Sequence, residues 1–392
     1  MPINYQQALE QIQSMGQVAR HRQEALREKA EQARQLLVEY AGRGDELRDL
    51  VQLAANLNPR LRCALPTTER LDAALAPAAP PQPFALLAAD GSQINPDRHS
   101  AVEFGAVNVG AIRFGPERSP REWVSSSLKF GDDLYNEHRP LTELDIAILR
   151  DLEERRMLLE LAGADHALGL PVVTLTDGPL ELFSQEQDNP FFKQKLEQYL
   201  GVLREMAGIH TAVAGYVDKP RSDYLTAALE LVLLDRAGQL SQAGKIRDLW
   251  PVRDIDLLGH LVQPGRRSAV FQLRSSAAQH FSGELALHYF YLNVGREGKA
   301  HLARVEIPRW VAQDAGLIDL LHAALLEQCA QMGVRPFPYV LHRAHEVAVV
   351  RLEEKDQIEN MIIAELHRQG VEVGEESGKQ SAKDLPGRKR ME

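Results

Sequence analysis

The sequence predicts an α/β fold in which helices flank a mixed five-stranded sheet. Two apolar runs that each end in Asp-Gly, at residues 84–91 and 170–178, have the pattern of buried strands. A long amphipathic helical pattern at 142–164 separates them, and strand and helix patterns alternate after the second run. Such alternation is typical of parallel strands that are joined by crossover helices.

The first three strands are predicted to form a meander. Phe84–Ala89 reads as a short buried strand that stops at Asp90-Gly91. Ser100–Val109 and Gly110–Phe114 are β-rich and nearly adjacent, which favours antiparallel pairing with the first strand. Glu117–Arg139 is polar, so we expect a loop there.

The later elements complete the predicted sheet. Thr142 and Asp145 resemble a helix capping box with Asp in place of Glu, and they open the helix at 142–164. The expected order continues with strands at 171–176 and 211–217 and helices at about 190–206 and 224–236. Three adjacent strands, helix, strand, helix, strand and helix are the order of the ribonuclease H fold.

Segments outside this core extend the chain at both ends. Residues 1–56 are predicted to be a helical arm, with helices at about 4–41 and 45–56, that packs on its own domain or pairs with a second subunit or partner. Residues 57–83 are rich in Pro and Ala and read as a linker, and 373–392 read as a basic disordered tail. Additional strands and helices in the C-terminal half complete a main domain at 84–372, with strands near 268–275, 287–294 and 300–307 and helices near 314–332 and 344–369.

Composition limits the function classes. The net charge of −10 argues against a nucleic-acid coat protein, which would need a basic surface, but it does not exclude a nuclease with local basic residues. Cys63 and Cys329 are far apart and form no metal or redox motif, which fits a reducing compartment. No apolar run approaches the roughly 20 residues of a membrane span, and the polar N-terminus lacks a signal-peptide core. A cytoplasmic location is therefore expected.

Two aspartates at strand ends are the main indication of chemistry. Asp90 and Asp177 each follow an apolar run, and the predicted strand order places both at the same edge of the sheet. Neighbouring carboxylates repel each other unless a divalent cation neutralises them, and hard oxygen ligands without Cys suit Mn²⁺ or Mg²⁺. The pattern predicts metal-dependent phosphoryl transfer.

The helix at 142–164 is expected to add a third carboxylate. With Leu152 at the centre of the apolar face, Glu153 lies roughly 100° away and Glu154 roughly 200° away. This places Glu153 at the edge of the core and Glu154 toward solvent, so Glu153 is the predicted ligand. Glu160 shares the flank of Glu153 and remains an alternative, as does Glu154.

A fourth group is expected from Pro336–Glu346. His342 and His345 are three residues apart at a Pro-rich turn that enters the last helix, and imidazole can bind Mn²⁺ or move a proton near neutral pH. His345 is the predicted metal or proton-transfer residue. Tyr339 is predicted to position a phosphate or a base.

Several short motifs, in order, resemble the NurA nuclease family. They are Ala-Ala-Asp-Gly-Ser at 88–92, Asn108-Val-Gly-Ala-Ile-Arg, Thr176-Asp-Gly-Pro-Leu, Gly215-Tyr-Val-Asp-Lys, Val262-Gln-Pro-Gly-Arg-Arg-Ser, Tyr289-Phe-Tyr-Leu, Arg304-Val-Glu-Ile-Pro and Pro338-Tyr-Val-Leu-His-Arg-Ala-His. The resemblance implies a Mn²⁺-dependent DNA exonuclease and endonuclease in double-strand-break repair. It also implies a homodimer that works with a HerA-type hexameric ATPase. By position it makes Asp90 and Asp177 the metal aspartates, Glu153 or Glu154 the helix carboxylate, and His345 the late metal or proton-transfer residue with Tyr339 beside it.

Basic residues near strand ends and turns are candidates for holding the DNA strand. We predict Lys219, Arg266, Arg267 and Arg98 for this role, and Lys219 is the strongest because it follows a strand end. Two other functions fit the same sequence. One is a non-catalytic adaptor that clamps a DNA translocase, and the other is a ribonuclease H-like enzyme acting on RNA or a hybrid.

Overall fold

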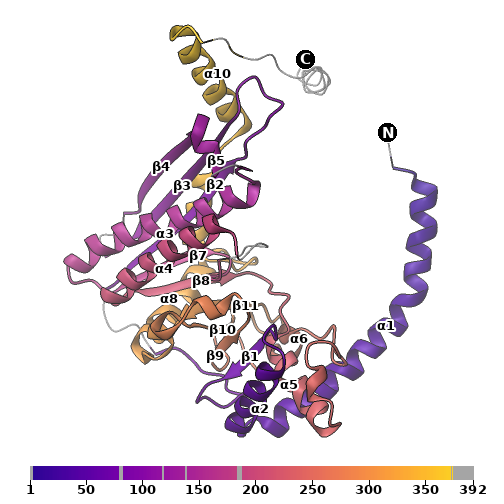
Figure 1. Cartoon of the computed structure of the whole chain (residues 1–392). Helices are drawn as coiled ribbons and strands as arrows, with labels where there is room; N and C mark the ends of the chain where they lie inside the picture. Colours follow the sequence, from indigo (N-terminus) through magenta and orange to yellow (C-terminus); the bar gives the residue numbers. More distant parts are fainter. Residues whose placement is uncertain are drawn as a thin grey trace. The chain divides into compact units, whose positions relative to one another are not determined.

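The computed structural model describes residues 3–78, 83–116, 119–136, 139–182, 188–371 and 373 (Figure 1). The chain divides into two compact units that are both discontinuous in sequence. The first unit contains residues 1–78 and 216–315, and the second contains residues 79–215 and 316–392. These bounds differ from the predicted arm, linker and main domain. The predicted basic tail lies outside the described residues, except for residue 373.

The second unit contains the predicted ribonuclease H-like sheet. Its strand order is β8–β7–β2–β3–β4, with β3 antiparallel to β2 and to β4 and with β7 parallel to β2. The strands are β2 (Ala85–Ile94), β3 (Phe104–Phe114), β4 (Arg121–Phe130), β7 (Val172–Asp177) and β8 (Ala212–Val217). A two-stranded ribbon accompanies them, formed by β5 (Tyr135–Asn136) and β6 (Arg139–Pro140). The mixed five-stranded sheet is confirmed.

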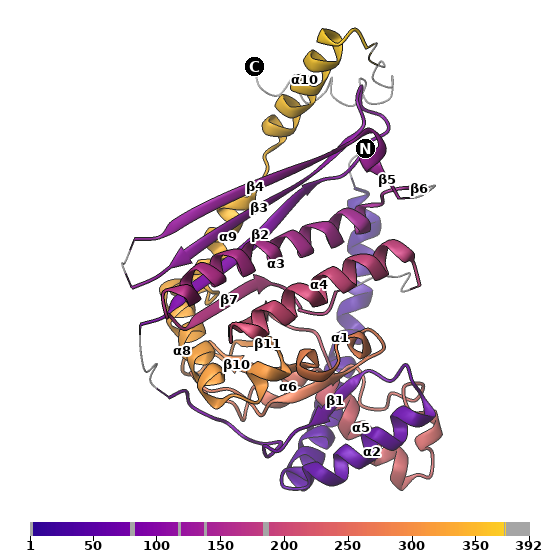
Figure 2. The same cartoon turned by 60° about the vertical axis from the view of Figure 1, so that its left-hand side comes forward.

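Helices cover both faces of this sheet. In Figure 2, α3 and α4 lie on the near face and α9 lies behind β2 and β3. The helices of the unit are α3 (Glu143–Ala167), α4 (Pro190–Gly208), α8 (Ala315–Gln331), α9 (Tyr339–Ala348) and α10 (Leu352–Arg368). The N-terminus of α3 carries the predicted capping box, in which Thr142 accepts from the amide of Asp145 and the Asp145 carboxylate accepts from the amide of Thr142. Val350, Ile358 and Ile362 attach α10 to the sheet by packing on a small buried cluster of β2 and β3 side chains.

Two predictions for the meander are wrong. Phe104–Phe114 forms one long strand, β3, where two strands were expected over Ser100–Phe114. The third strand is β4, which lies in the segment predicted as a loop. Because β4 is an edge strand whose residues are mostly exposed, it lacks the apolar alternation by which strands are identified.

The first unit holds the helical arm and a second, antiparallel group of strands. Their order is β1–β9–β10–β11. The strands are β1 (Cys63–Pro66), β9 (Phe271–Arg274), β10 (Leu287–Asn293) and β11 (Leu302–Pro308), and the helices are α1 (Tyr5–Tyr40), α2 (Gly44–Leu57), α5 (Tyr224–Arg236), α6 (Asp254–Leu258) and α7 (Arg309–Ala312). Strand β1 lies in the segment predicted as a linker, so that prediction is wrong for residues 63–66.

Among the described side chains of the arm helix α1, the buried ones lie in its C-terminal half. Its buried apolar residues begin at Ala30 and contact the helices of the same unit. Toward the N-terminus an apolar stripe stays exposed, made of Tyr5, Leu9, Ile12, Met15 and Val18. Packing on its own domain is supported by the C-terminal half of the arm. Pairing with a second subunit or partner keeps support from the exposed apolar face of the N-terminal half. Across the described ranges, no helix combines the length and apolar character that crossing a membrane requires.

Candidate active site

The two aspartates come from neighbouring parallel strands. The register pairs Ala89 of β2 with Thr176 of β7, so Asp90 and Asp177 are the next residues on each strand. Strand β7 ends at Asp177, whereas β2 continues to Ile94. The prediction that the first strand stops at Asp90 is wrong. Asp90 instead lies where β2 loses its partner on that side, so the sheet opens beside its carboxylate.

Asp90 forms a close pair with His345 of helix α9. His345 Nδ1 donates to Asp90 Oδ2 at 2.7 Å, and the amide of Gly91 donates to Asp90 Oδ1 at 2.9 Å. The imidazole is 63% exposed while the Asp90 side chain is only 20% exposed. The pair therefore has a fixed carboxylate and an accessible ring. His342 and His345 both lie within α9, so the prediction of one long helix entered by a turn at these residues is wrong.

Buried polar contacts fix α9 on the sheet. The hydroxyl of Ser92 and the side-chain amide of Asn108 both donate to the carbonyl of Ala348, at 2.6 and 2.7 Å. Gly110 of β3 allows the close approach, because a Cβ atom there would lie 2.5 Å from the backbone nitrogen of Ala348. These residues set the position of His345 over Asp90. Ser92 therefore lies within β2 and helps to hold α9.

Helix α3 turns Glu154, and not Glu153, toward the aspartates. Glu154 is 6% exposed, and a Cβ atom on Gly91 would lie 2.8 Å from its Oε1 atom. Glu153 pairs with Arg156 on an exposed flank, with a distance of 2.7 Å. Glu160 is also exposed. The expectation that Glu154 faces solvent is wrong, and the choice of Glu153 loses its geometric basis.

Glu154 is held in an unusual environment for a carboxylate. Burial, followed by the neighbouring carboxylate of Asp151, raises the pKa of Glu154 well above its ordinary value, and Asp90 adds to the effect. The nearest cation is Arg150, whose Nε atom lies 3.5 Å from Glu154 Oε1. Arg150 also binds Asp151 at 2.9 Å and packs its stem over Gly91. Strongly perturbed buried carboxylates of this kind are more frequent at functional sites.

A cavity of about 300 Å³ opens between α3 and the end of β7. Asp151, Glu154 and Asp177 line it together with Arg155. Arg155 is 2% exposed, and its guanidinium donates to the hydroxyls of Tyr199 and Thr176. Its Nη1 atom has no hydrogen-bond partner within the described part of the chain. Neither Asp151 nor Arg155 could be singled out from the sequence, because a polar residue on a helix gives no signal that it points inward.

The loop after Asp177 is fixed from two sides. Tyr199 of α4 donates to the carbonyl of Leu180 at 3.1 Å. Gly215 of β8 lies directly under the loop, since a Cβ atom there would be 2.5 Å from the carbonyl oxygen of Gly178. Gly178 itself has a φ of +93°, which favours glycine. The backbone that follows Asp177 is therefore closely defined.

The other predicted residues lie apart from Asp90. Tyr339 begins α9, and its ring packs at 6.0 Å on Phe114, whose strand partner is Leu86. His342 faces Glu346 at 3.6 Å, and Arg98 is exposed in the turn after β2.

The remaining basic candidates belong to the first unit. Lys219 is exposed after β8. Arg266 is exposed and donates to the carbonyl of Ala74. Arg267 is 7% exposed and paired with Glu69 at 2.8 Å, so it is not available to a ligand at the surface.

Comparison with known proteins identifies the family. The NurA domain profile matches residues 84–350. The chain is similar in structure to the NurA nuclease from Sulfolobus solfataricus, with 15% identity, a TM-score of 0.45, and coverage of 85% of this chain and 96% of that one. Two further structures have lower scores. Ciona intestinalis Endonuclease V in complex with DNA has 10% identity and a TM-score of 0.30, covering 83% of this chain and 98% of that one. LC9-RNase H1 has 15% identity and a TM-score of 0.19, covering 43% and 75%. No curated protein matches the chain. The profile match spans more than half of the sequence, and the chain belongs to the NurA family.

Proposed function

We propose that this protein is a metal-dependent nuclease that hydrolyses DNA phosphodiesters. The observation that carries the proposal is the Asp90–His345 contact of 2.7 Å beside the buried carboxylate of Glu154. Membership of the NurA family supports it, as does the name of the Sulfolobus relative, which is a nuclease. Asp177 belongs to the same group because its strand is the neighbour of β2.

The donor set fits a hard divalent cation. Asp90, Glu154 and Asp177 supply carboxylate oxygens and His345 supplies an imidazole, which suits Mn²⁺ and also Mg²⁺. Burial raises the pKa of Glu154, and repulsion from Asp151 and Asp90, which a nearby cation would offset, adds to this. Among the described residues, no three His, Cys, Asp or Glu side chains already lie in a metal-binding arrangement. Support for the metal is therefore the chemistry of the donors and the electrostatics around Glu154.

The chain's own residues have distinct roles in this proposal. A bound cation would activate water and offset the charge that develops on the phosphate. Asp90 orients the imidazole of His345, and the exposed ring can exchange a proton with water or a leaving oxygen. Glu154 and Asp177 supply the negative charge that selects a cation. Arg155 positions the end of β7 through Thr176 and, through Tyr199, the loop that follows.

The cellular role extends the same proposal. We propose that the protein processes DNA ends in double-strand-break repair as a homodimer, together with a HerA-type hexameric ATPase, in the cytoplasm. The family resemblance is the basis for these partners. The exposed apolar stripe on the N-terminal half of α1 offers a surface that a protein partner would cover.

One cleavage assay tests the activity. Labelled linear DNA is incubated with the wild-type chain in Mn²⁺, Mg²⁺ or EDTA, beside Asp90→Asn and Asp177→Asn. The expected result is cleavage that requires the cation and falls at least about 100-fold in both variants. Asp132→Asn is the matched control, because Asp132 is exposed in the turn after β4. Unchanged cleavage in both site variants would overturn the assignment.

The same assay separates the alternatives. Absence of cleavage by the wild type, with and without a ring ATPase, would favour the adaptor. Faster cleavage of RNA or a hybrid in a competition experiment would favour the ribonuclease H-like activity.

A further inference from the structure

Two loops of the first unit meet at one end of its strands. The loop after β8 begins at Asp218, and the turn between β10 and β11 ends at His301. His301 Nε2 lies 2.7 Å from Asp218 Oδ1, which joins the two loops. The turn is closed by two backbone hydrogen bonds between Arg296 and Lys299, of 3.1 and 2.9 Å. The loops are therefore fixed relative to each other.

Four cations lie on these two loops. Lys219 and Arg221 follow Asp218, and Arg296 and Lys299 lie in the turn. All four are exposed, and none forms an ion pair or a side-chain hydrogen bond with a described residue. Their positive charge is therefore available to a ligand.

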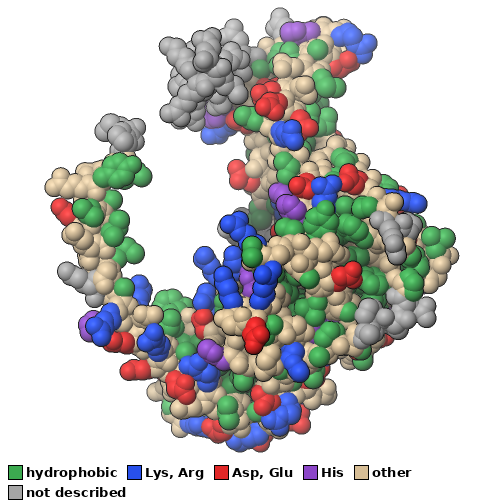
Figure 3. Space-filling model, turned by 180° about the vertical axis from the view of Figure 1, so that it is seen from behind, with side chains coloured by type: hydrophobic (Ala, Val, Ile, Leu, Met, Phe, Trp, Pro, Cys, Tyr) green, Lys and Arg blue, Asp and Glu red, His purple; other side chains and the backbone are tan. Residues whose placement is uncertain are grey.

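The carboxylates nearby are mostly occupied. Asp218 pairs with His301, Asp223 with Arg247 at 2.6 Å, and Asp256 with Arg253 at 2.6 Å. Glu297 is the exception on the two loops, as it is exposed and forms no ion pair with a described residue. Four free cations against one free carboxylate leave a local excess of positive charge on a chain whose net charge is −10. Figure 3 shows Lys and Arg side chains gathering on one face of the molecule.

Lys219 also has a strained backbone. Its φ is +44°, which a residue other than glycine adopts at a cost of about 1 kcal/mol. The contact of Asp218 with His301 and the burial of Pro220 hold the chain on both sides of it. This conformation fixes the direction in which the lysine leaves the loop.

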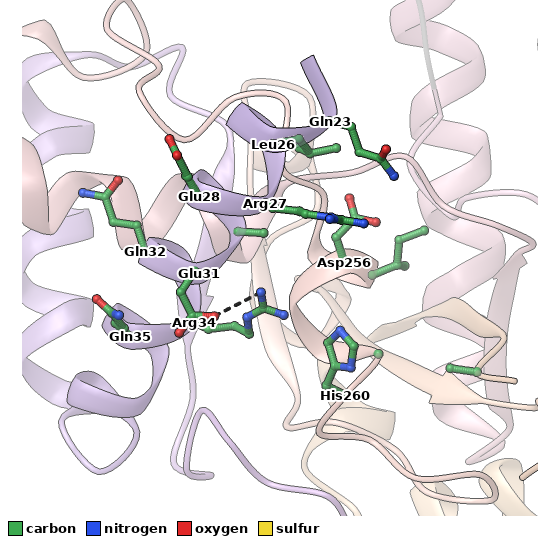
Figure 4. A pocket seen from close by; sticks show the side chains of 14 residues that line it. Gln23, Leu26, Arg27, Glu28, Glu31, Gln32, Arg34, Gln35, Asp256 and His260 are labelled. Carbon is green, nitrogen blue, oxygen red and sulfur yellow. Dashed lines mark ion pairs between the residues drawn. The ribbon is translucent and has the colours of Figure 1, made fainter. Parts of the chain in front are cut away.

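The groove beside the two loops does not share their excess of positive charge. A groove of about 1010 Å³ separates α1 from α6, and Ala300 forms part of its rim. Figure 4 shows Arg27, Arg34 and His260 there, but also Glu31 and Asp256, and Arg34 pairs with Glu31 at 3.2 Å. With Glu28 included, the groove has two arginines against three carboxylates, so it carries no excess of positive charge.

We propose that Lys219, Arg221, Arg296 and Lys299 form a surface that binds the phosphate backbone of DNA without reading its sequence. The inference rests on the proposed function and assigns a DNA contact to the first unit, separate in sequence from the carboxylates of the second. Exposed lysine and arginine groups suit phosphate oxygens, and such contacts release counterions when they form. They position DNA and carry no base information.

The test is the salt dependence of DNA binding in EDTA, where cleavage cannot interfere. Fluorescently labelled duplex DNA is titrated with the full chain at several salt concentrations. The double variant Lys219→Gly with Lys299→Ala should lower the slope of log K against log salt by about 2, because each lost phosphate contact removes about 0.9. Glycine is chosen at residue 219 because it accepts the positive φ. The charge-preserving Lys219→Arg variant should keep the wild-type slope.

Arg43→Ala is the matched control. Arg43 is exposed in the same unit but pairs with Glu39 and Glu46, so its removal should leave the slope unchanged. An unchanged slope in the double variant, while the wild type cleaves DNA with Mn²⁺, would overturn this surface and leave the proposed function intact. A reduced slope in a chain that never cleaves DNA would support the surface and contradict the nuclease.

Discussion

Asp254 in the first unit and Glu154 in the second are both buried carboxylates, but they differ in how many hydrogen-bond donors the fold supplies. Asp254 in the first unit is fully buried. It accepts from the amides of Leu225 and Thr226 at 3.1 and 3.0 Å, from the Thr226 hydroxyl at 3.1 Å, and from the Tyr291 hydroxyl at 2.7 Å. It therefore caps the first turn of α5 from outside the helix. Every oxygen of this carboxylate has a donor, which is the arrangement of a structural group.

Glu154 in the second unit is almost as deeply buried but lacks such partners. Within the described residues it forms no hydrogen bond, and its ion pair with Arg150 has a distance of 3.5 Å. A buried carboxylate that the fold leaves unsatisfied is costly, so a ligand that satisfies it is expected. The comparison shows that the number of donors, rather than burial alone, separates the structural carboxylate from the functional one.

The largest expected effect is on catalysis. Glu154→Gln should lower DNA cleavage by about 100-fold or more, because it removes a charge that would bind the cation, while unfolding is unchanged or occurs at a higher temperature. Glu153→Gln, its neighbour on the exposed flank, should cleave within about 2-fold of wild type. Cleavage rates and thermal unfolding of the two variants check this. An equal loss of DNA cleavage in both variants would contradict the different roles assigned to the buried and exposed flanks of α3.

The structural carboxylate should show the reverse pattern. Asp254→Ala leaves buried donors at the start of α5 without an acceptor, so the free energy of unfolding should fall by about 3 kcal/mol. Denaturant unfolding measures this change. Cleavage per folded molecule at low temperature should stay near wild type. A stable but inactive Asp254→Ala variant would contradict the structural assignment.

The pH dependence of stability follows from the same group. Burial raises the pKa of Asp254 from its ordinary value of 3.8 to about 6. The folded protein therefore holds this proton up to about pH 6, whereas the unfolded chain loses it near pH 4. Between these values the folded state binds one more proton, so the free energy of unfolding falls by about 2–3 kcal/mol as the pH rises. Unfolding curves of Asp254→Asn should lack this decrease, and an identical decrease in the variant would show that another group causes it.

The smallest effect concerns the support of His345. Ser92→Ala removes one of two donors to the Ala348 carbonyl, so unfolding should become easier by about 1 kcal/mol and cleavage should fall several-fold. In a His345→Ala background the same substitution should leave cleavage unchanged, because the group that it positions is absent. A double-mutant cycle measures this difference. Additive losses would mean that Ser92 acts by a different route.

Most of the sheet could be predicted from the sequence because its central strands are apolar. The runs at 84–89 and 171–176 are apolar and each is followed by Asp-Gly, which predicts β2 and β7, and the capping box predicts the start of α3. Strand β4 could not be found, since an edge strand that is exposed on both sides carries no apolar alternation. Strand β1 is mostly buried, but it has only four residues and stands in a Pro-rich segment, which hides its pattern.

The site was predicted less completely, for a physical reason in α3. The buried face of this helix includes Arg155, which binds two hydroxyl groups, and Asp165, which pairs with Arg113 at 2.7 Å. A buried face that is defined by the apolar residues alone is centred too near Leu152. Such a face wrongly predicts that Glu154 points toward solvent. Asp90 and His345 could be named from the sequence because Asp90 follows an apolar run and His345 follows a Pro-rich segment. Their contact depends on α9 lying across β2 and β3, which no local pattern shows.

Diffraction from crystals soaked in Mn²⁺ tests the central claim most directly. Anomalous scattering locates the ion without any assumption about activity, and Asp90→Asn crystals provide the comparison. We expect an anomalous peak between β2, β7 and α3, in contact with Asp90, that is lost or weakened in the variant. A peak elsewhere on the chain, or an undiminished peak in the Asp90→Asn crystals, would contradict it.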